Sequence, residues 1–158
     1  MRNEGRVGRR RCAMERCCLF LRCVLPCVMT DTVRTNPPVR SFRDLIVWQR
    51  AMELAEESVL LAERLPVGKL RSLRDQIQRS AASIPANIAE GNGKQRTGDY
   101  LRYLSMANGS LMELQTHIEL AARLHLASGT EVAKARGLSE EVSRMLRALI
   151  RALERRRA

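Results

Sequence analysis

The chain has 158 residues, a length typical of one folded domain with its own core. Aromatic residues make up only 3% of it, which favours aliphatic packing between helices over a β-sandwich. The formal net charge is +11: residues 1–40 hold nine Arg against three acids (+6), and residues 41–158 hold nineteen Lys and Arg against fourteen acids (+5). The folded part is therefore only moderately basic, and the total charge overstates its nucleic-acid signal.

The first 40 residues differ in composition from the rest. All five cysteines lie within the first 27 residues, and no C-x-x-C pair among them suggests a zinc site. The apolar stretch CCLFLRCVLPCV is interrupted by Arg22, is too short to span a bilayer, and is followed by no A-x-A-like cleavage site. We therefore expect residues 1–40 to be a disordered or mis-called N-terminal extension, and residues 41–158 to form the folded domain without a membrane anchor.

The first predicted helix follows an extended TNPPVRS segment. Asp44 is its expected N-cap, and its apolar stripe runs to about Leu65. Trp48 and Met52 lie beside that stripe, so the apolar face is unusually broad. LPVGK then breaks the chain.

The second predicted helix begins near residues 69–70 and carries Pro85 in its interior. Proline lacks the N–H that would bond to the carbonyl four residues earlier, so a kink is expected there. Small side chains surround it, which lets another helix approach closely, and Ser80 or Ser83 can hydrogen-bond backbone carbonyls near the bend. A glycine of the GNG at 91–93 is expected to end the helix in the left-handed conformation.

The third predicted helix begins at Thr97 or Asp99. Its apolar residues alternate steps of three and four, the pattern of coiled-coil-like packing. This seam consists of Leu104, Ala107, Leu111, Leu114, Ile118, Ala121 and His125.

The fourth predicted helix has Ser139 as its expected N-cap, with Gly137 outside and two acids in the first turn, where the helix dipole favours them. Its apolar face consists of Val142, Met145, Leu146, Leu149, Ile150 and Leu153. Arginines occupy the opposite face. Four amphipathic helices without an alternating strand pattern indicate an all-α, antiparallel four-helix bundle with a Pro-kinked second helix.

Three ordered motifs resemble a known family: FRDLIVWQRAMELA at 42–55, SIPANIAEGNGK at 83–94 and YLRYLSMANGSLMEL at 100–114. They are similar to the bacterial 23S rRNA intervening-sequence proteins over about residues 42–127. The resemblance implies a four-helix bundle that assembles as a ring-like cytoplasmic homopentamer and has no established enzymatic activity. More distantly, that family resembles the accessory variability protein of diversity-generating retroelements, which binds nucleic acid and a reverse transcriptase; both partners follow here by analogy.

The residues themselves do not indicate an enzyme. A di-metal bundle needs Glu-x-x-His on two helices, whereas Glu113 precedes His117 by four residues and His125 lies on the same helix. We interpret His125 as the end of the core seam and His117 as a surface or interface residue. GNGK is interpreted as a helix stop, because no complete phosphate-loop motif surrounds it. We expect no catalytic residue, metal or cofactor.

Basic helical faces form the candidate site, to which structured RNA or duplex DNA would bind through its phosphate backbone. Its residues are Arg71, Arg74, Arg79, Lys94, Arg96, Arg144, Arg147, Arg151, Arg155, Arg156 and Arg157. In one monomer these could equally be solvated faces, but five copies at +5 each would bring about +25 together. Tyr100 and Tyr103 are expected to pack rather than stack on bases. The alternative is a protein-interaction adaptor that uses apolar surface near Trp48 or Met52.

Overall fold

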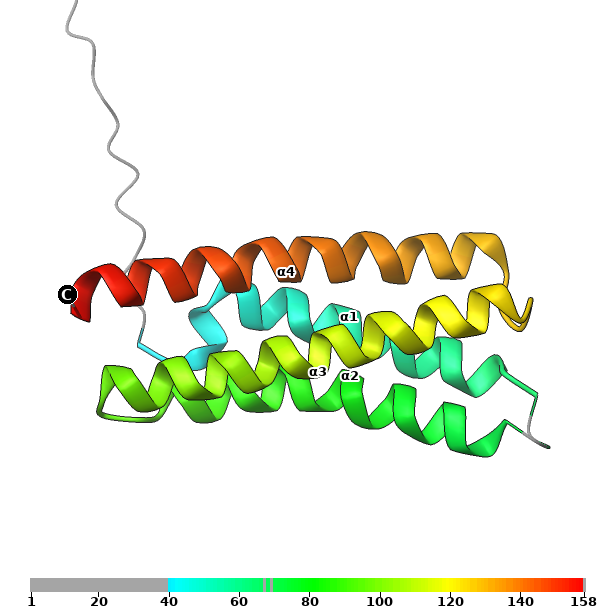
Figure 1. The fold of residues 1–158 in the computed structure, drawn as a ribbon, viewed down its shortest axis with the longest axis horizontal. Coiled ribbons are helices and arrows are strands. Elements are labelled where there is room, and N and C mark those ends of the chain that lie inside the picture. The colour runs from blue at the N-terminus through cyan, green and yellow to red at the C-terminus, as the bar shows by residue number, and fades with distance from the viewer. Residues whose placement is uncertain (1–39, 67, 69, 158) are drawn as a thin grey trace, which may run out of the picture. The chain divides into compact units, whose positions relative to one another are not determined.

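The computed structural model describes residues 40–66, 68 and 70–157. Figure 1 shows four helices packed side by side, each running opposite to the next. Each helix packs on two others: α1 and α3 both pack against α2 and α4. No strand occurs among the described residues, so the predicted antiparallel four-helix bundle is confirmed. The elements are the 3-10 turn η1 (Phe42–Asp44) and the helices α1 (Ile46–Arg64), α2 (Arg71–Asn92), α3 (Thr97–Arg123) and α4 (Gly129–Arg157).

The core is a continuous apolar cluster to which all four helices contribute. Its largest fully buried side chains include Leu54, Ile77, Ile84, Leu104, Leu111, Ile118, Val142 and Leu146. The predicted stripes are confirmed where they supply these residues, because side chains three and four apart share one helix face. The predicted N-terminal extension and its five cysteines lie outside the described residues, apart from Arg40.

The seam of α3 ends earlier than the spacing predicts. Ala121 is fully buried, but His125 is exposed, lies beyond the helix end and has a φ of 54°. The N–H of Leu126 bonds to the carbonyl of Ala121, and the N–H of His125 bonds to that of Ala122. This is the Schellman pattern, in which His125 takes the left-handed position usually given to glycine. The interpretation of His125 as a core residue is therefore wrong.

The caps of α1 and α4 also differ from the sequence-based expectation. Ser41, not Asp44, is the N-cap of the turn that precedes α1, and Asp44 accepts hydrogen bonds from the backbone of Arg40 and Ser41, each at 2.9 Å. The expected cap of α4, Ser139, is buried inside that helix, where it accepts a bond from Gln115 Nε2 at 3.1 Å.

The helix α4 begins well before Ser139, at Gly129. Ser128 and Glu131 form a reciprocal pair at this start: the backbone N–H of Ser128 donates to Glu131 Oε2 at 3.0 Å, and the backbone N–H of Glu131 donates to Ser128 Oγ at 3.3 Å. Gly137 is thus a helical residue rather than one outside the helix. The added turns lengthen the face that α4 presents to α1 and α3.

The helix α2 continues without a break through Pro85, which is buried. Ser80 Oγ donates to the carbonyls of Gln76 (2.7 Å) and Ile77 (3.3 Å). Both carbonyls lie in the turn before that of Ala81, to which Pro85 has no N–H to donate. The bend itself stays a prediction. The expected close approach is seen where Ser83 Oγ lies 2.9 Å from Ser110 Oγ on α3.

The end of α2 does not use a left-handed glycine. Gly93 is the C-cap with a φ of −74°, and no glycine among the described residues has a positive φ. Gly91 is required for a different reason, since a Cβ placed on it would lie 2.7 Å from Tyr100 Cδ2 and 2.9 Å from Tyr103 Cβ. Its missing side chain lets α2 and α3 meet closely at their shared end.

Candidate nucleic-acid interface

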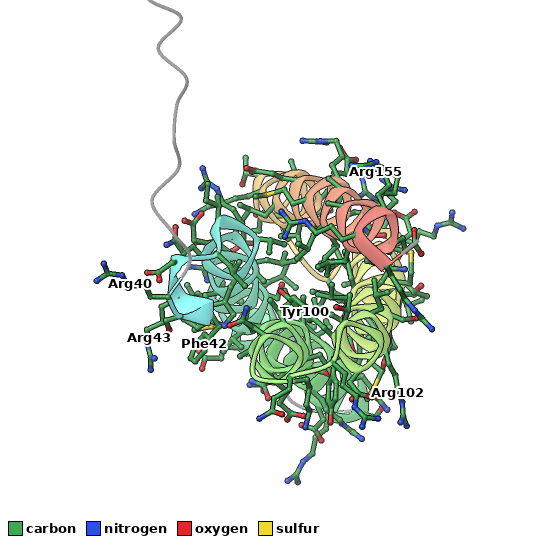
Figure 2. All side chains as sticks on the ribbon, turned by 90° about the vertical axis from the view of Figure 1, so that its left-hand side faces the viewer. Arg40, Phe42, Arg43, Tyr100, Arg102 and Arg155 are labelled. Carbon is green, nitrogen blue, oxygen red and sulfur yellow. The ribbon has the colours of Figure 1, made fainter. Side chains whose placement is uncertain are left out.

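One end of the bundle gathers basic side chains. Here α1 and α3 begin and α2 and α4 end, and Figure 2 looks directly onto it. Eight exposed cations lie at this end against four acids (Asp44, Glu90, Asp99 and Glu154), which leaves an excess of four positive charges. We call this group the basic end; it consists of Arg40, Arg43, Lys94, Arg96, Arg102, Arg155, Arg156 and Arg157.

The cations of the basic end form no ion pair with any other described residue. At the opposite end of the bundle, Arg71 and Arg74 of α2 are also without an ion-pair partner among the described residues, but four other cations, all exposed, are paired with acids. Those pairs are Arg64 with Glu131, Lys134 with Glu57 at 2.6 Å, and Arg123 (2.8 Å) and Arg136 with Glu119. The positive charge of the basic end is therefore free to act on an external anion.

Aromatic rings anchor two of these cations. The guanidinium of Arg43 lies 4.5 Å from the centroid of Phe42, whose ring packs edge-on against Trp48 at 5.1 Å. Lys94 Nζ lies 4.9 Å from the centroid of Tyr103. Cation–π contacts of this kind hold the charged groups near the surface of the bundle. They also cover ring faces that could otherwise stack on bases.

Tyr100 occupies the middle of this end, while Arg40, Arg43, Arg102 and Arg155 lie around its rim (Figure 2). Burial raises the pKa of the Tyr100 phenol, whose buried hydroxyl has no hydrogen-bond partner among the described residues. The phenol therefore stays neutral and packs between helices, as predicted.

The last turn of α4 reaches the first turn of α3. A Cβ placed on Gly98 would lie 3.8 Å from Arg157 Nη1. The N-cap of α3, Arg96, makes no side-chain hydrogen bond to the first turn. Free backbone N–H groups at a helix start attract anions. Arg157 lies beside this start, Lys94 and Arg96 precede it in the chain, and Asp99 is the acid of its first turn.

The structure divides the eleven predicted site residues among three places. It brings Lys94, Arg96 and the three arginines at 155–157 together at the basic end, and it places Arg144, Arg147 and Arg151 along the exposed side of α4. Arg71 and Arg74 lie at the opposite end of α2, with Arg79 between the two ends.

Sequence reasoning missed Arg40, Arg43 and Arg102. Arg40 and Arg43 flank the capping turn before α1, and Arg102 lies in the second turn of α3. In an antiparallel four-helix bundle, the first and third helices begin at the same end. The predicted topology could therefore have placed these three arginines beside Lys94 and Arg96.

The two histidines lie on α3 and just beyond its end, away from the basic end. His117 is half-buried, with its Nε2 3.6 Å from Glu113 Oε1, and His125 is exposed. Within the described part of the chain, no three His, Cys, Asp or Glu side chains come close enough to share a metal ion. Among the same residues, no helix combines the length and apolarity that a bilayer span requires.

The fold and the basic end together define a small antiparallel helical bundle with one strongly cationic end. The family model described as 23S rRNA-intervening sequence protein matches residues 43–148, and the chain belongs to this family. Among solved structures, it is similar to a protein of unknown function from the S23 ribosomal protein family of Bacteroides thetaiotaomicron VPI-5482. The two are 27% identical with a TM-score of 0.62, over 66% of this chain and 98% of that one. No curated protein matches the chain.

Proposed function

We propose that this protein is a non-enzymatic, homo-oligomeric scaffold that binds structured RNA or DNA through its basic end. One observation carries the proposal: eight exposed cations, none of them ion-paired with a described residue, lie together at one end of the bundle. Unpaired Lys and Arg side chains bind phosphates and release the counterions that nucleic acids condense.

The contacts would be made to the nucleic-acid backbone. Phosphates would lie against Lys94, Arg96 and Arg157 and against the free amides at the start of α3. The rings of Phe42 and Tyr103 are partly covered by Arg43 and Lys94, so base stacking contributes little. We therefore expect weak dependence on sequence and steep dependence on salt.

Assembly into an oligomer would multiply the positive charge that each basic end presents. The family resemblance leads us to expect a homopentamer in the cytoplasm, which would repeat the basic end five times. Five copies of the +5 folded part would bring about +25 into one particle. Clustered charge of one sign speeds the encounter with a polyanion and strengthens its capture.

The alternative is a protein-interaction adaptor, such as an accessory subunit of a reverse transcriptase. Trp48 is half-buried against the core and against Phe42, so it offers less free surface than the sequence indicates. The exposed apolar side chains on α1 are instead Ile46 (57% exposed) and Leu60 (45%). An adaptor would bind through such residues, and its affinity would vary little with salt.

The test is fluorescence anisotropy of a labelled RNA hairpin and a matched DNA duplex, titrated with the full chain across a salt series. A triple variant, Lys94→Gln, Arg96→Gln and Arg157→Gln, removes three charges from the basic end. If each contacts one phosphate, the slope of log K against log salt on the duplex should fall by about 2.7, at about 0.9 per contact.

The matched control removes three charges elsewhere: Arg71→Gln, Arg74→Gln and Arg79→Gln on α2. It should keep the wild-type slope. Absence of binding at low salt would refute nucleic-acid binding. An equal fall of the salt slope in both triple variants would refute its location at the basic end.

A further inference from the structure

The exposed side of α1 carries an acidic ridge. We use this name for Glu53, Glu56, Leu60 and Glu63, four exposed residues that follow one another at steps of three and four. Glu56 and Glu63 form no ion pair with a described residue. Leu60, between them, is 45% exposed.

The outer side of α4 carries the opposite charge at the same kind of spacing. Its basic ridge consists of Arg144, Arg147 and Arg151, all exposed and none ion-paired with a described residue. The pairs Glu56–Glu63 and Arg144–Arg151 are each seven residues apart, so both span about 10.5 Å at ~1.5 Å per residue. When two such ridges pack in parallel or antiparallel orientation, each glutamate of one can face an arginine of the other.

A hollow adjoins the basic ridge, between α3 and α4. It has a volume of about 430 Å³ and is lined by Met112, Gln115, Glu140, Ser143, Arg144 and Arg147. A second hollow of about 240 Å³ continues along the same pair of helices and shares Gln115 and Glu140 with the first. Met112 is 42% exposed, and the small side chains Ser139 and Ser143 are buried beneath, so the surface is recessed and partly apolar.

We propose that the acidic ridge of one copy packs against the basic ridge of a second copy, with Leu60 entering the hollow beside Met112. This inference rests on the homo-oligomeric part of the proposed function. Exposed ion pairs contribute little affinity by themselves, but they fix register and partner. The burial of Leu60 supplies the apolar contact.

The contact joins two unlike surfaces, so each copy has one ridge left to bind the next. Such heterologous contacts close into a ring when the rotation between copies permits it. The arginines in the middle of α4 would then be neutralised within the assembly. The basic end would remain open to nucleic acid, which separates the two sets of arginines by role.

The test measures the mass of the full chain by sedimentation velocity. The acid reversal Glu56→Arg with Glu63→Arg, and the arginine reversal Arg144→Glu with Arg151→Glu, should each raise the dissociation constant on the order of tenfold or more, because like charges then face each other. The four substitutions combined in one chain should restore the wild-type mass. Circular dichroism confirms that each variant is folded.

A matched control reverses two exposed acids elsewhere, Asp75→Arg and Glu113→Arg, and should leave the mass unchanged. Leu60→Gln gives a second reading without any change of charge and should also weaken association. A monomeric wild type would overturn the assembly itself. An oligomeric wild type whose mass survives both reversals, or a fourfold variant that stays dissociated, would overturn the ridge contact and leave the assembly standing.

Discussion

Two glycines on neighbouring helices should respond differently to the same substitution by alanine. At Gly109 of α3 a Cβ would meet nothing within 4 Å, so Gly109→Ala should raise the free energy of unfolding by up to about 1 kcal/mol, the gain in helix propensity. At Gly91 of α2 the new Cβ would lie 2.7 Å from Tyr100 Cδ2 and 2.9 Å from Tyr103 Cβ. Real Cβ atoms do not approach other heavy atoms that closely, so the helices must move apart.

Overpacking of this kind costs about 1–3 kcal/mol, which exceeds or cancels the propensity gain at Gly91. Because the propensity term is common to both, Gly91→Ala should be less stable than Gly109→Ala by about 1–3 kcal/mol. This corresponds to roughly 4 °C in Tm per kcal/mol for a domain of this size. Urea unfolding followed by circular dichroism at one protein concentration measures the difference. Two variants that agree within about 0.5 kcal/mol would refute the close approach of α2 and α3.

The start of α4 should make stability depend on acid pH. The Ser128 hydroxyl and then the Arg64 guanidinium lower the pKa of Glu131 to about 2. A lowered carboxyl pKa stabilises the fold above the usual value of 4.5, and this contribution is lost as pH falls from 4.5 towards 2. Glu131→Gln should therefore flatten the pH dependence of Tm in that range more than the exposed control Asp75→Asn; equal profiles would contradict this. His125→Gly should raise the unfolding free energy by about 1 kcal/mol by removing a left-handed non-glycine residue, and a loss in urea unfolding would count against the Schellman end.

Periodicity along the sequence predicted the helices and most of the core, because which side chains share a face is a local property. Periodicity did not predict the segments whose structure depends on contacts with other helices. The segment from Gly129 to Leu138 looks like a linker, with two glycines and few large apolar residues. It is helical because Val132 and Ala135 are buried and Lys134 pairs with Glu57 on α1.

The candidate site could be predicted only in part. Basic residues on a single helix can be identified from the sequence. Which of them lie close together in the fold depends on which helix ends are adjacent. Arg43 and Arg155 are more than a hundred residues apart in the chain, yet both lie at the basic end (Figure 2). Whether a cation is free or paired is also a tertiary property, since Arg64 and Arg136 are paired with acids on other helices.

The central claim is that nucleic acid binds at the basic end, and site-specific photocrosslinking tests it most directly. A photoreactive residue would replace Gln95, exposed in the loop between α2 and α3, or Thr130, exposed at the opposite end of the bundle. Neither replacement changes the charge. The account predicts crosslinks to a labelled RNA hairpin from position 95 and few from position 130. Equal or stronger crosslinking from position 130 would contradict it.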